Sequence, residues 1–522
     1  MIGNMDWVQK HTALVLFALV LTVGVFLAPQ VGLTWDEADN IFAGGVYATF
    51  FKEGLNPHAF DGFWDQRSLF HGTIYTQNPT LEHYPPVPIY VGTGITLLSR
   101  LVGYGYTGPQ IVILFHVATA LFFAILVSTV YRFAILLELS PATAVFAGLA
   151  TYFYPTLFGH GLTNLKDTAQ VSLFTLAMYY LVRFIVRRKQ TDIIVGAVVW
   201  GLGLSTKMNA IYVPVIWGVW TLFHKKYSPL FMMYCSLLVM AIGLAIAFIT
   251  WPYLWFDPVN RAIAVIQYFA TIGQGYTIFW NGVSYLVGEG KPLWWYPWAS
   301  LFFMSPQILL ILAVVGGLRV LWEGNRKRRL LLIWLIVPPL RAILPNAAFY
   351  DGLRHFMEIL PAFILLSAVG VSGIWSLVKS RTVHILYPVI LGAILGYMAI
   401  INYQYFPYST GYYNVFTPHP NINFDRDIEG LAVGEAVAYL NGLKAQYNVW
   451  IPIASHVGWN YVSYPNQIVR DMSMGNIVIV INKSSHIRNI PELRVLPELP
   501  GFVLDHVISR GSAVFGWIYK RK

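Results

Sequence analysis

The chain has 522 residues, of which 57% are apolar and only 11% are charged. A soluble protein needs more charge on its surface, so this composition excludes a soluble globular protein and predicts a multi-pass membrane protein. The formal net charge is +10, but the basic residues stand in short clusters between apolar segments. That pattern is typical of cytoplasmic loops and argues against nucleic-acid binding. The single cysteine, Cys235, excludes an intramolecular disulfide.

The N-terminal apolar segment, residues 12–29, is the first predicted membrane span. No small-residue cleavage motif follows it, so we expect a retained helix rather than a signal peptide. Residues 30–110 then form a long first outer loop with juxtamembrane helices. Its moderately apolar stretch, residues 87–102, is predicted to lie along the membrane surface, because a crossing there would place every later basic cluster outside.

The later apolar segments alternate with basic clusters, such as Arg187-Arg188-Lys189 and the run from Arg326 to Arg329. This alternation predicts about eleven crossings, with the basic clusters inside and the acidic and polar motifs outside. We therefore predict a mostly α-helical membrane domain over residues 1–402. The spans predicted after the first are residues 111–131, 142–158, 169–185, 193–204, 211–223, 230–250, 295–321, 330–340, 356–377 and 383–402.

The tail, residues 403–522, has a different pattern. Short apolar runs at residues 448–455 and 476–481 are separated by Pro, Gly and Asn, which predicts strands, and residues 434–443 predict a helix. The tail is therefore predicted to be a soluble α/β domain on the extracytoplasmic side of the membrane.

An acidic turn follows the first span, with Asp36, Glu37 and Asp39 in the sequence TWDEADN. Carboxylates are unfavourable next to hydrocarbon, so their presence at a membrane surface indicates a functional site. A carboxylate there can accept a proton from an attacking hydroxyl or bind a divalent cation. The structural alternative is the N-cap of a helix. We favour function for Asp36 and leave Glu37 and Asp39 open.

Two further polar motifs are predicted on the same side. Asp167, preceded by Lys166, begins a returning helix, where an aspartate also simply complements the helix dipole. Lys207 ends the motif Ser205-Thr206-Lys207 after a very apolar helix. Such a lysine either extends to the interface or binds a phosphate as a point charge.

The fourth motif is YDGLRHFMEILP, which contains Arg354 and His355, with Arg341 upstream. An arginine suits a phosphate because its planar fork donates two parallel hydrogen bonds. Contact with a lipid headgroup is the alternative. The histidines show no spacing typical of a zinc site.

These motifs, taken in order, resemble the GT-C class of integral-membrane glycosyltransferases. The resemblance is greatest to protein O-mannosyltransferases and bacterial lipid A aminoarabinose transferases, and it spans roughly residues 12–370. It is carried by the DE pair after the first helix, then EHYPPVPIY, NLKDTAQVSLFTLAMYYLVR, STK and RHFMEILPAFILLSAVG.

The resemblance implies a polyprenyl-phosphate sugar donor and a catalytic base at Asp36, with Asp167 as a second acidic residue. Glu82 and His83 lie where the family often has HPPL, although Tyr84 interrupts that pattern here. The resemblance implies no required cofactor, but a divalent cation could bind where Asp36, Glu37 and Asp167 converge. The expected substrate-binding residues are Glu37, Glu82, His83, Asp167, Lys207, Arg354 and His355.

The predicted function is therefore that of a multi-pass glycosyltransferase of the cytoplasmic (inner) membrane with an extracytoplasmic active site. It would transfer a monosaccharide, with inversion, to a hydroxyl of a lipid, glycan or protein. A transporter or lipid flippase is the alternative. Transporters tend to bind their substrates at the bilayer midplane between repeated halves, whereas this sequence has no internal repeat and its polar motifs gather at one surface.

Overall fold

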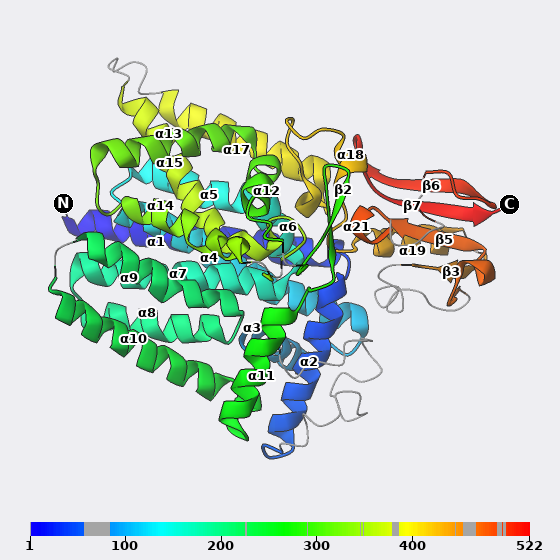
Figure 1. Ribbon diagram of the computed structural model, residues 1–522, viewed down its shortest axis with the longest axis horizontal. Coiled ribbons are helices and arrows are strands. Elements are labelled where there is room, and N and C mark those ends of the chain that lie inside the picture. Colours follow the sequence, from blue (N-terminus) through cyan, green and yellow to red (C-terminus); the bar gives the residue numbers. More distant parts are fainter. Residues whose placement is uncertain are drawn as a thin grey trace.

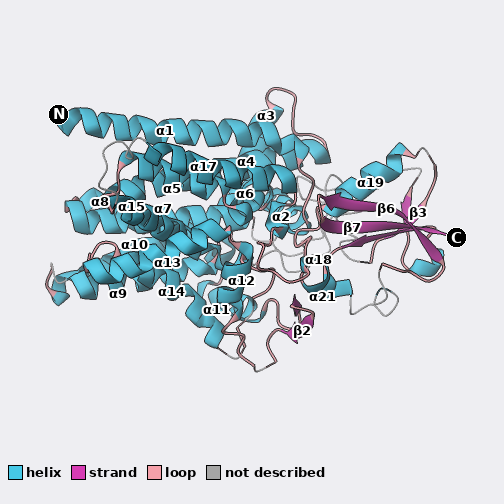
Figure 2. Cartoon of the chain, turned by 90° about the horizontal axis from the view of Figure 1, so that it is seen from above, coloured by secondary structure: helices cyan, strands magenta, loops and turns pink. Residues whose placement is uncertain are grey.

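The computed structural model describes residues 2–56, 84–224, 227–289, 291–344, 346–347, 349–377, 386–443, 445–452, 466–487, 493 and 497–522. Long helices lying side by side form most of the molecule, and a small sheet lies beyond one end of them (Figure 1). That end is opposite the one at which the first helix begins (Figure 2).

Six described helices are long and apolar enough to cross a membrane. The predicted total of about eleven crossings stays a prediction, since several other apolar helices are shorter. Four of the spans are α4 (Gly108–Leu136), α7 (Leu165–Arg187), α10 (Pro229–Thr250) and α17 (Leu386–Tyr405). The span Trp7–Gln30 combines α1 (Ile2–Leu27) with η1 (Ala28–Gln30), and the span Arg354–Ser376 combines η7 (Arg354–Ile359) with α15 (Leu360–Ser376). The shorter apolar helices include α5 (Pro141–Phe153), α8 (Gln190–Leu204), α9 (Tyr212–His224), α13 (Gln307–Glu323) and α14 (Arg329–Ile336).

Two predicted spans are each divided in the structure. Residues 142–158 were expected to form one helix, but α5 ends before Tyr154 and α6 (Pro155–Thr163) follows. Residues 295–321 are likewise divided into α12 (Tyr296–Met304) and α13. In both places a proline forces the preceding residue into an extended conformation, which ends the helix.

Close helix packing in the bundle depends on glycine where α13 crosses α15. A Cβ added at Gly316 would lie 1.9 Å from the Leu366 carbonyl oxygen, and one at Gly370 would lie 1.9 Å from that of Leu312. Only glycine fits at these two positions, so the two backbones approach directly, as small residues allow in membranes.

Two helices run across the direction of the bundle in Figure 1, namely α2 (Trp35–Lys52) and α11 (Pro258–Thr271). The 14 residues of α3 (Val87–Arg100) span about 21 Å, which is too short to cross a bilayer core of about 30 Å. That length agrees with the predicted surface position of this stretch. Neither α11 nor the hairpin of β1 (Thr277–Trp280) and β2 (Val283–Leu286) was predicted from the sequence.

The tail contains a five-stranded mixed sheet in the order β4-β3-β5-β7-β6. β3 (Asn448–Trp450) is parallel to β4 (Gln467–Ile468) and β5 (Ile477–Ile481). β7 (Ala513–Arg521) is antiparallel to β5 and to β6 (Phe502–Arg510). All five residues of β5 are buried, as expected for a central strand covered on both faces. The expected helix and strands are confirmed in α19 (Ala432–Gly442), β3 and β5.

The segment between α17 and the sheet attaches the tail to the bundle. The Asn414 backbone N–H donates to the Phe303 carbonyl at 2.8 Å, and its side-chain amide donates to the carbonyls of Phe302 and Ser305. Phe424 packs against Trp280 with ring centroids 4.9 Å apart. These contacts hold the acidic segment after Phe424 against the end of the bundle that faces the sheet.

The short helices are η1 (Ala28–Gln30), η4 (Met208–Ile211), η5 (Pro252–Trp255), η6 (Pro338–Ile343), η7 (Arg354–Ile359), η8 (Ser409–Gly411), α18 (Pro420–Asn423), η9 (Met472–Met474) and α21 (Ser484–Ile487).

Candidate active site

The acidic turn forms the first turn of α2. Thr34 is the N-cap, and a capping box links it to Glu37, whose carboxylate accepts from the Thr34 backbone N–H at 2.7 Å. The other Glu37 oxygen lies 2.7 Å from His116 Nε2 on α4, and both side chains are buried. Glu37 therefore braces the start of α2 and is directed away from Asp36, which is 25% exposed.

Asp39 lies one turn further along α2 beside Tyr84 and Lys166. The Tyr84 hydroxyl donates to Asp39 at 3.4 Å, and the Lys166 ammonium lies 4.3 Å from the centre of the Tyr84 ring. Burial, reinforced by the negative charge of Asp39, raises the pKa of Tyr84 well above its ordinary value. The phenol therefore stays protonated and serves as a hydrogen-bond donor.

Asp167 is held at the start of α7 by Asn164, the N-cap residue. The Asn164 side chain accepts from the Asp167 backbone N–H and donates to its carboxylate, both at 3.0 Å. The Asp167 carboxylate also binds Lys207 Nζ at 2.6 Å and Arg354 Nε at 2.8 Å. A single buried carboxylate thus joins three segments that are far apart in the sequence.

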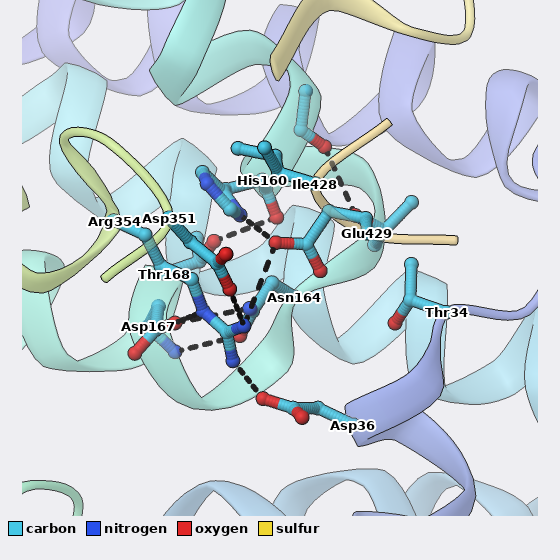
Figure 3. Close-up of polar contacts among 12 residues, drawn as sticks. Thr34, Asp36, His160, Asn164, Asp167, Thr168, Asp351, Arg354, Ile428 and Glu429 are labelled. Carbon is cyan, nitrogen blue, oxygen red and sulfur yellow. Dashed lines mark hydrogen bonds and ion pairs between the residues drawn. The ribbon is translucent and has the colours of Figure 1, made fainter. Parts of the chain in front are cut away.

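Arg354 lies at the centre of the cluster, at the start of η7 (Figure 3). Its Nη2 contacts Asp36, its Nε binds Asp167, and its Nη1 binds Asp351 at 3.2 Å. Glu429 Oε1 lies 3.9 Å from the same Nη1 atom. Arg354 is 5% exposed, so its charge is compensated by carboxylates rather than by water.

The loop that carries Arg354 is fixed by a second arginine, Arg341, on η6. Arg341 donates to the His355 carbonyl and, at 2.9 Å, to the side-chain oxygen of Asn209. The Asn209 amide in turn donates to Glu358 at 3.1 Å. The His355 ring packs against Tyr350 with centroids 4.4 Å apart, so its contacts are with this loop.

The structure brings together four of the predicted site residues, Asp36, Asp167, Lys207 and Arg354, whose contacts form one continuous network. Glu37 and His355 lie next to this network but bind elsewhere. Glu82 and His83, for which substrate binding was predicted, lie outside the described residues.

Three further residues complete the network and were not singled out in the sequence, namely Asp351, Glu429 and Lys483. Lys483, directly after β5, binds Asp351 at 2.6 Å, and its ammonium lies 3.9 Å from the centre of the Trp35 ring. The acidic run FDRDIEG, residues 424–430, was the available signal for Glu429, because it places three carboxylates close together near the start of the tail.

Burial governs the charge state of the carboxyl groups at the boundary between bundle and tail. It raises the pKa of Asp351, against the opposing effect of Lys483. Burial also raises the pKa of Glu429 to about 8, although Arg354 lowers it. A group with such a pKa is predominantly protonated at neutral pH.

The carboxylates of the predicted cation site have other partners in the structure. Among them, no group of three or more His, Cys, Asp or Glu side chains is arranged to hold a metal ion. Asp36 and Asp167 both contact Arg354, while Glu37 pairs with His116. Arg354 therefore occupies the position between Asp36 and Asp167, Glu37 is held by His116, and a metal bound by the two aspartates would have to displace the guanidinium.

Comparison with known proteins was made for the sequence and for the fold. Residues 83–253 match the family described as dolichyl-phosphate-mannose-protein mannosyltransferase. This match spans about a third of the chain and includes Asp167 and Lys207. No curated protein sequence matches the chain.

Among solved structures, ArnT from Cupriavidus metallidurans bound to undecaprenyl phosphate aligns over 97% of each chain, with 14% identity and a TM-score of 0.51. The chain has the ArnT fold. The oligosaccharyltransferase AglB from Archaeoglobus fulgidus, in complex with an inhibitory peptide and a dolichol-phosphate, aligns over 91% of this chain and 70% of its own, with 10% identity and a TM-score of 0.47.

The predicted fold class is confirmed by the ArnT alignment, which includes the helical bundle and the tail. The chain resembles GT-C glycosyltransferases, in particular O-mannosyltransferases and ArnT. Together with the six long apolar helices, this resemblance identifies a multi-pass membrane protein.

Proposed function

We propose that this protein is a membrane glycosyltransferase that transfers a monosaccharide from a polyprenyl-phosphate donor to an acceptor hydroxyl. The observation that carries the proposal is the direct contact of Asp36 with Arg354. A general base and a phosphate-binding cation must lie this close if one sugar carbon is to bond first to the phosphate oxygen and then to the acceptor oxygen. The family match and the lipid phosphate bound by ArnT support the class of donor.

In the proposed reaction, Arg354 and Lys207 bind the phosphate of the donor, with Lys166 beside them. Asp36 takes the proton of the acceptor hydroxyl, whose oxygen attacks the anomeric carbon opposite the phosphate. The bond from that carbon to the phosphate oxygen breaks, and the lipid phosphate leaves with both bonding electrons. The configuration of the anomeric carbon is therefore inverted. Stabilisation of the departing phosphate by fixed cations is the main electrostatic contribution.

The ion pair between Asp36 and Arg354 couples donor binding to activation of the base. A phosphate bound to Arg354 competes with Asp36 for the same guanidinium nitrogen. Donor binding thereby releases the Asp36 carboxylate toward the acceptor. Every step uses groups of the chain itself, so we expect activity to persist after chelation of divalent cations.

We place the active site and the tail on the extracytoplasmic side of the cytoplasmic membrane. The basic clusters between spans support this orientation, because such clusters remain in the cytoplasm. The acceptor hydroxyl would belong to a lipid, glycan or protein that reaches the site from that side.

The test uses the full-length protein in lipid nanodiscs, with undecaprenyl phosphate esters of mannose, glucose, galactose and arabinose as donors. Consumption of the lipid-linked sugar is followed by thin-layer chromatography in the presence of membrane extract as the acceptor source. We expect Asp36→Asn to lower the rate at least about 1,000-fold, because the amide cannot accept the proton. Glu53→Gln, at the exposed end of α2, serves as the matched control.

Full activity of Asp36→Asn would remove Asp36 as the base. If the wild-type protein moved intact lipid-linked sugars across the bilayer without cleaving them, a flippase would replace the proposed transferase. Reaction in the presence of a chelator tests the independence from divalent cations in the same assay.

A further inference from the structure

Glu429 is a buried carboxyl group that the tail delivers to the centre of the candidate site. It lies in the segment between α18 and α19, and its backbone carbonyl accepts from the Trp35 N–H at 3.3 Å. Asp427 stabilises the same segment by accepting from the backbone N–H groups of Leu431 and Ala432. The Glu429 side chain is 0% exposed, and Figure 3 shows its carboxyl group directed toward His160 and Arg354.

Both oxygens of Glu429 lack a hydrogen-bond partner among the described residues. The same is true of both ring nitrogens of His160, which is also 0% exposed. His160 Nδ1 lies 3.5 Å from Glu429 Oε1, so the four atoms form one group. Leaving a buried polar atom without a partner costs about 1–3 kcal/mol, and such atoms are rare in folded proteins. Four such atoms close together indicate a binding site in which a polar ligand supplies the missing hydrogen bonds.

Compensation of the Arg354 charge does not account for Glu429. The nitrogens of Arg354 already bind Asp167 and Asp351 and contact Asp36. Glu429 is the most distant of the four carboxyl groups, at 3.9 Å. A carboxyl group that served only as a counterion would lie at hydrogen-bond distance.

The chemistry of the pair fits hydroxyl groups. Since the pKa of Glu429 is raised to about 8 by burial, the group is mainly a neutral acid at pH 7, with one donor and free acceptor positions. A neutral imidazole likewise offers one donor and one acceptor. Neighbouring hydroxyls on a sugar ring are each donor and acceptor, so they complement both groups without introducing charge.

We propose that Glu429 and His160 form the subsite that binds ring hydroxyls of the transferred monosaccharide. This inference rests on the proposed function, because Arg354 would hold the donor phosphate next to the subsite. The tail would then recognise the sugar, while residues of the helical bundle hold the lipid phosphate and the base.

The experiment compares the affinity of the full-length protein in nanodiscs for two kinds of lipid. The first kind is undecaprenyl phosphate without a sugar, and the second kind is its mannose, glucose, galactose and arabinose esters. We expect at least one ester to bind the wild-type protein about tenfold more tightly than the sugar-free lipid, a gain typical of a few buried hydrogen bonds. Glu429→Ala and His160→Ala should each abolish this gain and leave the affinity for undecaprenyl phosphate within about twofold.

Glu429→Gln provides rescue, because the amide keeps one donor position and one acceptor position and should retain most of the gain. Glu498→Ala, an exposed tail substitution, is the matched control. Equal losses for all the lipids would assign Glu429 a structural role and overturn the subsite. The subsite would also be overturned if the wild-type protein bound no sugar ester more tightly than undecaprenyl phosphate. Failure of the wild-type protein to bind undecaprenyl phosphate at all would instead contradict the proposed function.

Discussion

Every nitrogen of the Arg354 guanidinium group contacts a carboxylate. Three of its nitrogen atoms meet three different carboxylates, which come from α2, α7 and the turn before η7. A lysine has the same charge but only one nitrogen, on a flexible stem, so it cannot hold these carboxylates at their separate directions. The geometry of the site therefore depends on arginine and not merely on a positive charge.

Arg354→Lys should lower kcat/KM about 100-fold, mainly through a higher KM for the donor, because a single ammonium cannot bind the phosphate and also hold the surrounding carboxylates. Steady-state rates measured over a range of donor concentrations will show how much of the effect lies in kcat and how much in the donor KM. Arg319→Lys, which changes a partly exposed pair with Glu323, is the control and should have the kinetics of the wild-type protein. An unchanged donor KM in Arg354→Lys would contradict phosphate binding by Arg354.

The raised pKa of Glu429 predicts how the stability of the folded protein depends on pH. Its value moves from an ordinary 4.5 to about 8 on folding, so between these pH values the folded protein holds a proton that the unfolded chain has released. Stability should therefore fall as pH rises through this window. Asp425 and Asp427, both raised to about 6, act in the same direction over a narrower range.

Glu429→Gln should show a smaller decrease in Tm than the wild-type protein between about pH 5 and about pH 8. Tryptophan fluorescence during thermal unfolding gives the Tm of each protein at each pH. The two aspartates remain in the variant, so the difference between the two pH profiles belongs to Glu429. Parallel profiles would show that Glu429 is ionised in the folded protein throughout this range.

At the scale of elements, the start of α2 is set by a polar brace. Glu37 binds Thr34, the N-cap of α2, and His116 on α4, and His116 Nδ1 lies 3.0 Å from the Ala28 carbonyl. This arrangement fixes the direction in which α2 leaves the end of α1. It thereby fixes the position of Asp36.

His116→Ala should destabilise the protein by about 3 kcal/mol, because it removes the charged partner of the buried Glu37 carboxylate on α4. We expect a lower Tm and a reduced kcat, since Asp36 loses its support, while the affinity for undecaprenyl phosphate is kept. Thermal unfolding and lipid binding measured on the same sample separate the two effects. A Tm equal to that of the wild-type protein would show that the brace is dispensable.

Local patterns in the sequence were sufficient for many elements. Long apolar runs predicted the helices, Asp167 was expected at the start of α7, and a short apolar run bounded by turn residues predicted β5. The breaks at Pro155 and Pro306 were missed because apolar composition continues across them. α11 was missed because its mixed polarity gives no spanning signal.

The contacts of the site were harder to predict. The order of the motifs suggested that Asp36, Asp167, Lys207 and Arg354 meet, but Glu429 and Lys483 reach them only through docking of the tail. Such long-range contacts have no periodicity in the sequence. The sequence also could not distinguish the roles of the neighbours Asp36 and Glu37. Only the structure shows that Glu37 belongs to the capping box, while Asp36 contacts Arg354.

At the scale of the whole molecule, the tail forms part of the candidate site. Lys483 joins Asp351 and Trp35, and Asp351 in turn joins Arg354. The tail thereby contacts both the residue before the proposed base and the partner of the central arginine. Separation of the tail from the bundle would disturb both.

Lys483→Met should lower kcat by at least about tenfold, because Asp351 loses its ammonium partner and competes more strongly for Arg354. Lys483→Arg should restore part of the activity by keeping the charge. Lys520→Met, on an exposed tail lysine, is the control. Activity rates and size-exclusion profiles, measured together, distinguish loss of the contact from loss of folding. Equal activity in Lys483→Met and the wild-type protein would exclude this coupling.

The position of Glu429 and Lys483 late in the chain has a consequence for biogenesis. The ribosome releases α2, α7 and η7 to the membrane before either residue has been made, so Asp351 lacks its lysine partner until the tail is complete. With the proposed orientation and activity, catalytic competence would then arise in a single late event, when the tail has been exported and folds onto the helices. Translocation of the tail, rather than insertion of the helices, would set the moment at which a new molecule starts to work.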